Sequence, residues 1–271
     1  MNDQSFLRAC QLRDDGNFKE ALDEFFRIAE NSADAIDKAG VLLNVAATLQ
    51  AMGEYEQARR QLTAARSLMP SSEDSSGSVL PDHRLLQLEL SLDLEDADIS
   101  SYEGKIEEAL TKFDLLLKKY AGWLKEPELR ESYETIQLRR GFILADLGRY
   151  KEATTILEEA ESFVHRNAEL YFYLGHSYLG MPDYKRAIGK FADALKLGLP
   201  RNLEYRAHCE LGIANFRLGD YVRAKMEFEK SAETADAEYI QQAQIWKWLE
   251  QTSGALGLKD LADRYSKKGL S

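Results

Sequence analysis

The sequence predicts an all-α protein built from repeated helix pairs, and three observations support this prediction. A short phrase of residues recurs six times along the 271-residue chain, and self-similarity of this kind is the signature of a repeat architecture. Only five prolines occur, which leaves room for long helices. Residues that favour helices, such as alanine, leucine, glutamate and lysine, are abundant.

Each copy of the phrase holds a turn residue, an aromatic residue or isoleucine two positions later, and an alanine five positions later. The turn residue is glycine in every copy except the fifth, which has proline. Successive copies are separated by 37, 51, 44, 34 and 37 residues. The copies are Gly16–Ala21, Gly53–Ala58, Gly104–Ala109, Gly148–Ala153, Pro182–Ala187 and Gly219–Ala224.

The phrase has a physical explanation as the turn between two paired helices. Glycine ends the first helix in a conformation that other residues resist, and the alanine lets the second helix approach the first closely. A large apolar residue follows four positions after each alanine, so the two share one buried stripe. These residues are Phe25, Leu62, Phe113, Leu157, Phe191 and Phe228.

The units resemble tetratricopeptide repeats, which follow the pattern W-x2-L-G-x2-Y, then A-x3-F, then P. The fifth unit is the best copy, with Tyr171, Leu174, Gly175, Tyr178, Tyr184, Ala187, Phe191, Ala194 and Pro200. The resemblance covers residues 3–70 and 130–235 well. It implies a right-handed superhelical α-α solenoid, in which the first helix of each pair lines a concave surface that holds the ligand.

The expected organisation is one continuous solenoid of about thirteen or fourteen helices. Residues 1–70 hold units one and two, residues 83–129 an irregular third unit, and residues 130–235 units four to six. Residues 71–82 are rich in serine, aspartate, glycine and proline, which predicts an exposed, mobile loop. Residues 236–271 read as a degenerate capping unit, with Trp246, Trp248 and Leu249 on one helix and a short polar helix after Gly257.

One segment of the third unit has an ambiguous pattern. Leucines alternate with other residues from Leu86 to Leu94, and a period of two is typical of a strand. The segment lacks β-branched residues and has no partner strand, so we predict a helix. Its leucines would then surround most of the helix, which should be more buried than its neighbours.

Composition and charge exclude several classes of function. The net charge of -11 argues against nucleic-acid binding, which relies on a basic surface. Residues 71–130 are the most acidic part, with 14 acidic against 7 basic residues; a solvated outer face explains this excess. Cys10 and Cys209 lack paired spacing, and no signal peptide or membrane span is visible. We therefore expect a cytoplasmic protein that does not insert into membranes.

No catalytic, metal-binding or nucleotide-binding motif is apparent, so we expect no enzyme activity, no catalytic residue, no metal and no cofactor. The four histidines, His83, His165, His176 and His208, are scattered. The acidic run of Asp93, Glu95, Asp96 and Asp98 lacks the glycine of an EF-hand loop. We interpret this run as acidity at a helix end.

The resemblance places a candidate groove on the first helices of units four to six, one stripe away from the packing stripe. The proposed peptide- or protein-binding residues are Leu138, Phe142, Phe172, His176, Leu179, Arg206, Ile213, Phe216 and Arg217. Most are apolar, which favours an amphipathic or apolar segment as ligand. The lysines and asparagines of a chaperone-binding carboxylate clamp are missing from these positions. Two alternatives stay open, in which the stripe is buried by the chain itself or mediates a homodimer.

The leading functional hypothesis is a scaffold or adaptor that docks an unidentified partner protein or peptide. A second hypothesis is a peptide-sensing regulator, since the irregular spacings resemble those of bacterial peptide-receptor arrays. A third is a self-associating, homodimeric tetratricopeptide-type subunit. An enzyme with a repeat appendage is disfavoured, because no second domain is visible to hold the chemistry.

Overall fold

The computed structural model describes residues 3–69, 83–164, 166–242 and 244–269. These residues form fifteen α-helices and one 3-10 helix and contain no strand. The chain divides into two compact units, Met1–Ile136 and Gln137–Ser271. The predicted loop at 71–82 lies outside the described residues. Among the described helices, none is long and apolar enough to cross a membrane.

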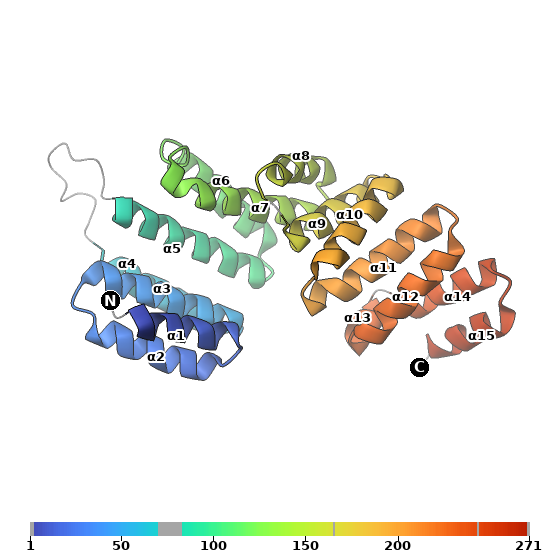
Figure 1. Ribbon diagram of the computed structural model, residues 1–271, viewed down its shortest axis with the longest axis horizontal. Coiled ribbons are helices and arrows are strands. Elements are labelled where there is room, and N and C mark those ends of the chain that lie inside the picture. The colour runs from blue at the N-terminus through green and yellow to red at the C-terminus, as the bar shows by residue number, and fades with distance from the viewer. Residues whose placement is uncertain (1–2, 70–82, 165, 243, 270–271) are drawn as a thin grey trace. The chain divides into compact units, whose positions relative to one another are not determined.

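Unit 1 contains three helix pairs, in which each helix packs on the next along the chain (Figure 1). Helix α5 also packs against α3, so the first helices of neighbouring pairs lie side by side. The elements are α1 (Asp3–Asp14), α2 (Phe18–Asn31), α3 (Ala35–Ala51), α4 (Tyr55–Ser67), α5 (His83–Tyr102), α6 (Ile106–Lys119) and η2 (Pro127–Leu129).

Unit 2 contains the fourth to sixth helix pairs and the C-terminal helices. Helix α7 begins at Arg130, just before this unit, and continues into it. The elements are α7 (Arg130–Asp146), α8 (Tyr150–Glu161), α9 (Ala168–Gly180), α10 (Tyr184–Leu197), α11 (Arg201–Arg217), α12 (Tyr221–Thr234), α13 (Ala237–Gln242), α14 (Ile245–Ala255) and α15 (Lys259–Lys268). The fold class, an all-α solenoid of tetratricopeptide-type helix pairs, is confirmed within each unit.

The repeated phrase forms the turn of each pair, as predicted. At Gly219 the φ angle is 81°, a conformation that glycine adopts without strain. Two backbone hydrogen bonds close this turn, from the Gly219 amide to the Phe216 carbonyl and from the Asp220 amide to the Asn215 carbonyl, both at 3.0 Å. The proline of the fifth turn keeps the equivalent of the second bond, from Asp183 to Tyr178 at 2.9 Å. Proline at position 182 therefore leaves the helix pair intact.

The predicted core stripe is also confirmed. The alanine of each phrase and the large apolar residue four positions later are at most 1% exposed in all six pairs. Glycines on α7, α9 and α11 bring the first helices close to these apolar residues. A Cβ atom at Gly175 would lie only 2.8 Å from Cδ1 of Phe191. Close packing of this kind leaves little room for larger side chains.

The ambiguous leucine segment is a helix, α5, and its leucines face several directions. Leu86, Leu88, Leu90 and Leu92 are all buried. Alternate residues of an α-helix lie about 200° apart, so a period of two places leucines on opposite sides of α5. Leu88 and Leu92 join the core formed by α1 to α4.

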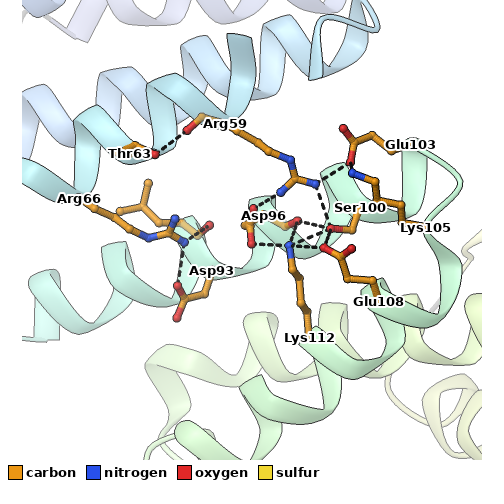
Figure 2. A network of polar contacts seen from close by, with 11 residues as sticks. Arg59, Thr63, Arg66, Asp93, Asp96, Ser100, Glu103, Lys105, Glu108 and Lys112 are labelled. Carbon is orange, nitrogen blue, oxygen red and sulfur yellow. Dashed lines mark hydrogen bonds and ion pairs between the residues drawn. The ribbon is translucent and has the colours of Figure 1, made fainter. Parts of the chain in front are cut away.

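The acidic run lies inside α5 rather than at a helix end, so that interpretation was wrong. Asp93 and Asp96 instead form ion pairs with basic residues of α4 and α6 (Figure 2). Asp96 lies eight residues before the turn glycine of its own pair, Gly104. The equivalent residue of the fifth pair, eight positions before Pro182, is the buried Leu174. A packing position that is apolar in α9 is thus ionic in α5.

The C-terminal residues form one helix more than expected, because α13 and α14 are separate. Ile245 and Leu249 of α14 are fully buried against a cluster that includes Phe228 and Cys209. Helix α15 has no buried residue. A largely polar helix that covers the preceding pair is what a capping unit requires.

Candidate protein-binding site

The predicted groove residues lie on α7, α9 and α11 of unit 2. Helices α9 and α11 are in direct contact although each belongs to a different pair. The structure brings Phe172, His176 and Arg206 together on these two helices. It does not, however, expose a continuous apolar strip.

Phe142 and Phe172 were expected at the surface of the groove, and that expectation was wrong. Phe172 is fully buried and Phe142 is 7% exposed. The Phe172 ring packs 5.9 Å from that of Phe191 on α10, while the Arg206 guanidinium covers it at 5.1 Å. Phe142 stacks on Tyr173, with the ring centroids 4.3 Å apart. The buried face of these first helices is wider than one stripe, because side chains of the neighbouring first helix cover the second stripe.

The other apolar groove residues, Leu138, Leu179, Ile213 and Phe216, are half-buried, and Arg217 is exposed. Ile213 and Phe216 pack against the cluster that α14 completes. The Phe216 ring lies 5.4 Å from that of Trp248 in an edge-to-face arrangement. This end of the predicted strip is therefore partly covered by the chain's own C-terminal helices, as one of the two alternatives anticipated.

A group of polar side chains lies on the first helices α7, α9 and α11, among the predicted groove residues. We call this group the Arg206 cluster; its members are Asp146, Tyr173, His176, Arg206 and Glu210. The His176 Nδ1 lies 2.7 Å from a Glu210 carboxylate oxygen. The Tyr173 hydroxyl donates to Asp146 at 3.4 Å. The Arg206 guanidinium sits 3.8 Å from Asp146 and 3.9 Å from Glu210.

Arg206 is the least satisfied member of the cluster. A guanidinium carries five N–H donors, yet Arg206 makes no hydrogen bond to the part of the chain that the structure describes. Its two ion pairs are too long for hydrogen bonds. The side chain is 30% exposed, and its guanidinium carbon lies over the Phe172 ring, 5.1 Å from the ring centroid. This cation is accessible and positioned before any ligand arrives.

Burial and charge together set the protonation of the cluster. Burial opposes protonation of His176, but the hydrogen bond and charge of Glu210 outweigh it and raise the pKa of the imidazole. Partial burial raises the pKa of Asp146, although the positive charges of Arg206 and His176 act in the opposite direction. His176 thus tends towards the charged form and adds to the positive potential beside Arg206.

Sequence reasoning found His176 and Arg206 but missed Asp146, Tyr173 and Glu210. Two of these have a simple signal, since Asp146 follows Phe142 by four residues and Glu210 follows Arg206 by four. Residues four apart share a helix face. Tyr173 lies next to Phe172 in sequence and gave no such signal. Among the described residues, no group of three or more histidine, cysteine, aspartate or glutamate side chains is arranged to hold a metal ion.

Comparison with known proteins confirms the family resemblance. Residues 172–240, which include most of the Arg206 cluster, match the family model of the tetratricopeptide repeat. No curated protein sequence is significantly similar to the chain. The fold is similar to that of a tetratricopeptide repeat protein from Parabacteroides merdae, at 13% identity and a TM-score of 0.56, with 98% of this chain and 91% of that chain covered.

Two further solved structures share the fold. A chain of the APC/C hetero-tetramer Cut9-Hcn1 matches with a TM-score of 0.68 and 16% identity, over 100% of this chain and 46% of that chain. MamA from Desulfovibrio magneticus RS-1 matches with a TM-score of 0.50 and 24% identity, over 73% of this chain and 95% of that chain. At these identities the likeness concerns the fold. Residues 172–240 thus match the tetratricopeptide-repeat family, and 98% of the chain is similar in fold to a solved tetratricopeptide repeat protein.

Proposed function

We propose that the protein is an interaction scaffold, and that unit 2 binds a segment of a partner protein across the first helices α7, α9 and α11. The observation that carries this proposal is Arg206, an accessible guanidinium without a hydrogen-bond acceptor at the centre of the face. The tetratricopeptide fold supports a protein as the ligand. The cluster offers the partner a polar anchor rather than an apolar strip.

The chemistry of the cluster specifies what the partner should present. A carboxylate can accept two parallel hydrogen bonds from a guanidinium, and such charged pairs are stronger than neutral hydrogen bonds. The contact with Phe172 and the attraction of the flanking acids restrain Arg206, so less side-chain freedom is lost on binding. Leu179 on α9 and Ile213 on α11, both half-buried, provide apolar contact further along the same two helices. The expected ligand is therefore a peptide segment with an acidic residue near an apolar one.

The proposal predicts how binding depends on salt. A ligand held by an apolar strip would be insensitive to salt, whereas a carboxylate paired with Arg206 should weaken as ionic strength rises. The His176–Glu210 pair and Asp146 limit how many acidic residues the site accepts. A densely acidic segment would place like charges beside Asp146 and Glu210.

The test uses Arg206→Ala and Arg206→Lys, with Arg201→Ala as the matched control. Arg201 is exposed at the first position of the same helix. Each tagged chain captures proteins from its native lysate, and abundances are compared by quantitative mass spectrometry. Loss of a hydrogen bond to a charged group costs about 1.5–3 kcal/mol, or about ten- to a hundredfold in affinity.

We expect partners that depend on Arg206 to be lost from both Arg206 variants and kept by Arg201→Ala. Lysine retains the positive charge of arginine but not the paired N–H donors of the guanidinium. Partial retention of a partner by Arg206→Lys would therefore indicate that the contact depends on charge alone. Circular dichroism checks that the variants remain folded. If every captured protein binds the Arg206 variants as well as the wild type, Arg206 is not the anchor and the proposal fails.

A further inference from the structure

The outer surface of helix α6 in unit 1 carries an apolar residue where the other repeats are mostly charged. Leu115 stands eleven residues after the turn glycine and is 56% exposed. At the same position the other five pairs have Arg27, Ala64, Glu159, Asp193 and Lys230. The position therefore faces outward in this architecture, and nothing in the packing of the helix pair requires a leucine there.

Leu115 borders a hollow of about 570 Å³ between α5 and α6. Leu116, which is 5% exposed, contributes apolar surface to the same hollow. The remaining lining is charged, with Asp93 and Asp96 from α5 and Lys112, Lys118 and Lys119 from α6. An apolar surface within a charged rim is the composition that recurs in protein interfaces.

The two carboxylates at this hollow each form ion pairs with a basic residue of α4 and with a lysine of α6. Asp96 pairs with Lys112 at 2.6 Å and also with Arg59 of α4 (Figure 2). Asp93 pairs with Arg66 at 2.9 Å and with Lys119 at 2.6 Å. Burial would raise the pKa of Asp93, but hydrogen bonds from Lys119 and Tyr120 outweigh it and lower the pKa.

The basic residues around the hollow outnumber its acids. Lys118 also lines the hollow and forms no ion pair with the described residues. Unit 1 as a whole carries 27 acidic and 15 basic residues. Lys118 thus adds one positive charge that no described ion pair neutralises, on a unit that otherwise repels anions. Extended polyanions are disfavoured by the surrounding charge, whereas a short segment with one or two acids is not.

We infer that this hollow is a second docking site, for a partner segment that presents an apolar side chain next to a carboxylate. The apolar side chain packs on Leu115 and Leu116, and the carboxylate pairs with Lys118 and Lys119. The site lies in unit 1 and shares no residue with the Arg206 cluster. It therefore goes beyond the proposed function and stands or falls independently of it.

The first step of the test identifies the segment that contacts Leu115. A photo-reactive phenylalanine analogue is placed at position 115 of the full chain, and at position 222 as control. Val222 is 59% exposed on α12, so the two positions have matching exposure and apolar character. After irradiation in native lysate, the cross-linked peptides are mapped by mass spectrometry.

The second step measures binding of the mapped segment as a labelled synthetic peptide. The variants are Leu115→Glu, which copies Glu159 of the fourth pair, and Lys118→Ser, which copies Ser162. Val222→Glu and Arg206→Ala are the controls. We expect about tenfold weaker binding for each of the first two variants and unchanged binding for the controls. A peptide with its acids replaced by amides loses the contacts to both Lys118 and Lys119, so it should bind at least as weakly as the original peptide binds to Lys118→Ser.

Several results would overturn the inference. One is a cross-linking yield at position 115 no higher than at position 222. A mapped segment without an acid beside an apolar residue is another. Cross-links that map to this chain itself, together with an oligomer that Leu115→Glu dissociates, would assign the hollow to a second copy instead. If Arg206→Ala loses peptide binding and Leu115→Glu keeps it, the peptide binds at the Arg206 cluster of unit 2 and not at the hollow.

Discussion

Replacing Gly175 by alanine tests a close packing contact between paired helices of unit 2. The new Cβ atom would lie 2.8 Å from both Cδ1 and Cε1 of Phe191, well inside van der Waals contact. The Phe191 ring is fully buried and cannot rotate away without moving its neighbours. Overpacking of this kind costs about 1–3 kcal/mol.

Helix propensity acts in the opposite direction, so a matched control is needed. Alanine is more favourable than glycine by about 1 kcal/mol inside a helix. Gly189 of α10 is exposed, and a Cβ atom there would meet nothing within 4 Å. Gly189→Ala should therefore stabilise the protein by about 1 kcal/mol. The difference between the two variants cancels propensity and isolates the packing term, about 1–3 kcal/mol.

The free energy of unfolding is measured by urea titration, followed by circular dichroism and by tryptophan fluorescence. Trp246 and Trp248 report on unit 2. Adding Phe191→Leu to Gly175→Ala should recover part of the loss, and a double-mutant cycle gives the coupling between the two sites. A difference between the alanine variants below about 0.5 kcal/mol would refute the argument that Gly175 is required by Phe191.

Three further predictions concern the same unit. Phe172→Ala should lower the free energy of unfolding by about 3–5 kcal/mol in a urea titration, because this ring lies in the core. A loss below about 1 kcal/mol would contradict the burial of the ring. Since Glu210 raises the pKa of His176 in the folded state, the stabilisation exists at low pH and disappears as pH rises through the folded pKa. Wild type should therefore exceed His176→Gln in stability at about pH 5.5 and lose that advantage by about pH 9, as urea titrations at both values would show. Burial raises the pKa of Cys209 to about 12, so a thiol reagent should modify Cys10 first and reach Cys209 only on unfolding; equal rates would contradict its burial.

The candidate site could be predicted only in part. The positions of His176 and Arg206 on one face of unit 2 follow from the spacing of the repeats. The burial of Phe142 and Phe172 could not be predicted from the sequence. Helical periodicity tells which residues share a face, but not how far a neighbouring helix covers that face. Arg206 of α11 lies over Phe172 of α9. The two residues are 34 positions apart, and no sequence pattern predicts a contact between them.

The helix pairs, their turns and the core between paired helices could all be predicted from the amino-acid sequence. These features depend on residues close in sequence, such as Gly219 at its turn and Phe228 four residues after Ala224, and local conformation is encoded locally. Which charged side chains take part in packing between helices could not be predicted, since it depends on how the helices lie in space. The acidic run that includes Asp93 and Asp96 suggested only acidity at a helix end. These residues join α5 to α4 and α6 instead, because their partners come from helices that folding alone brings together.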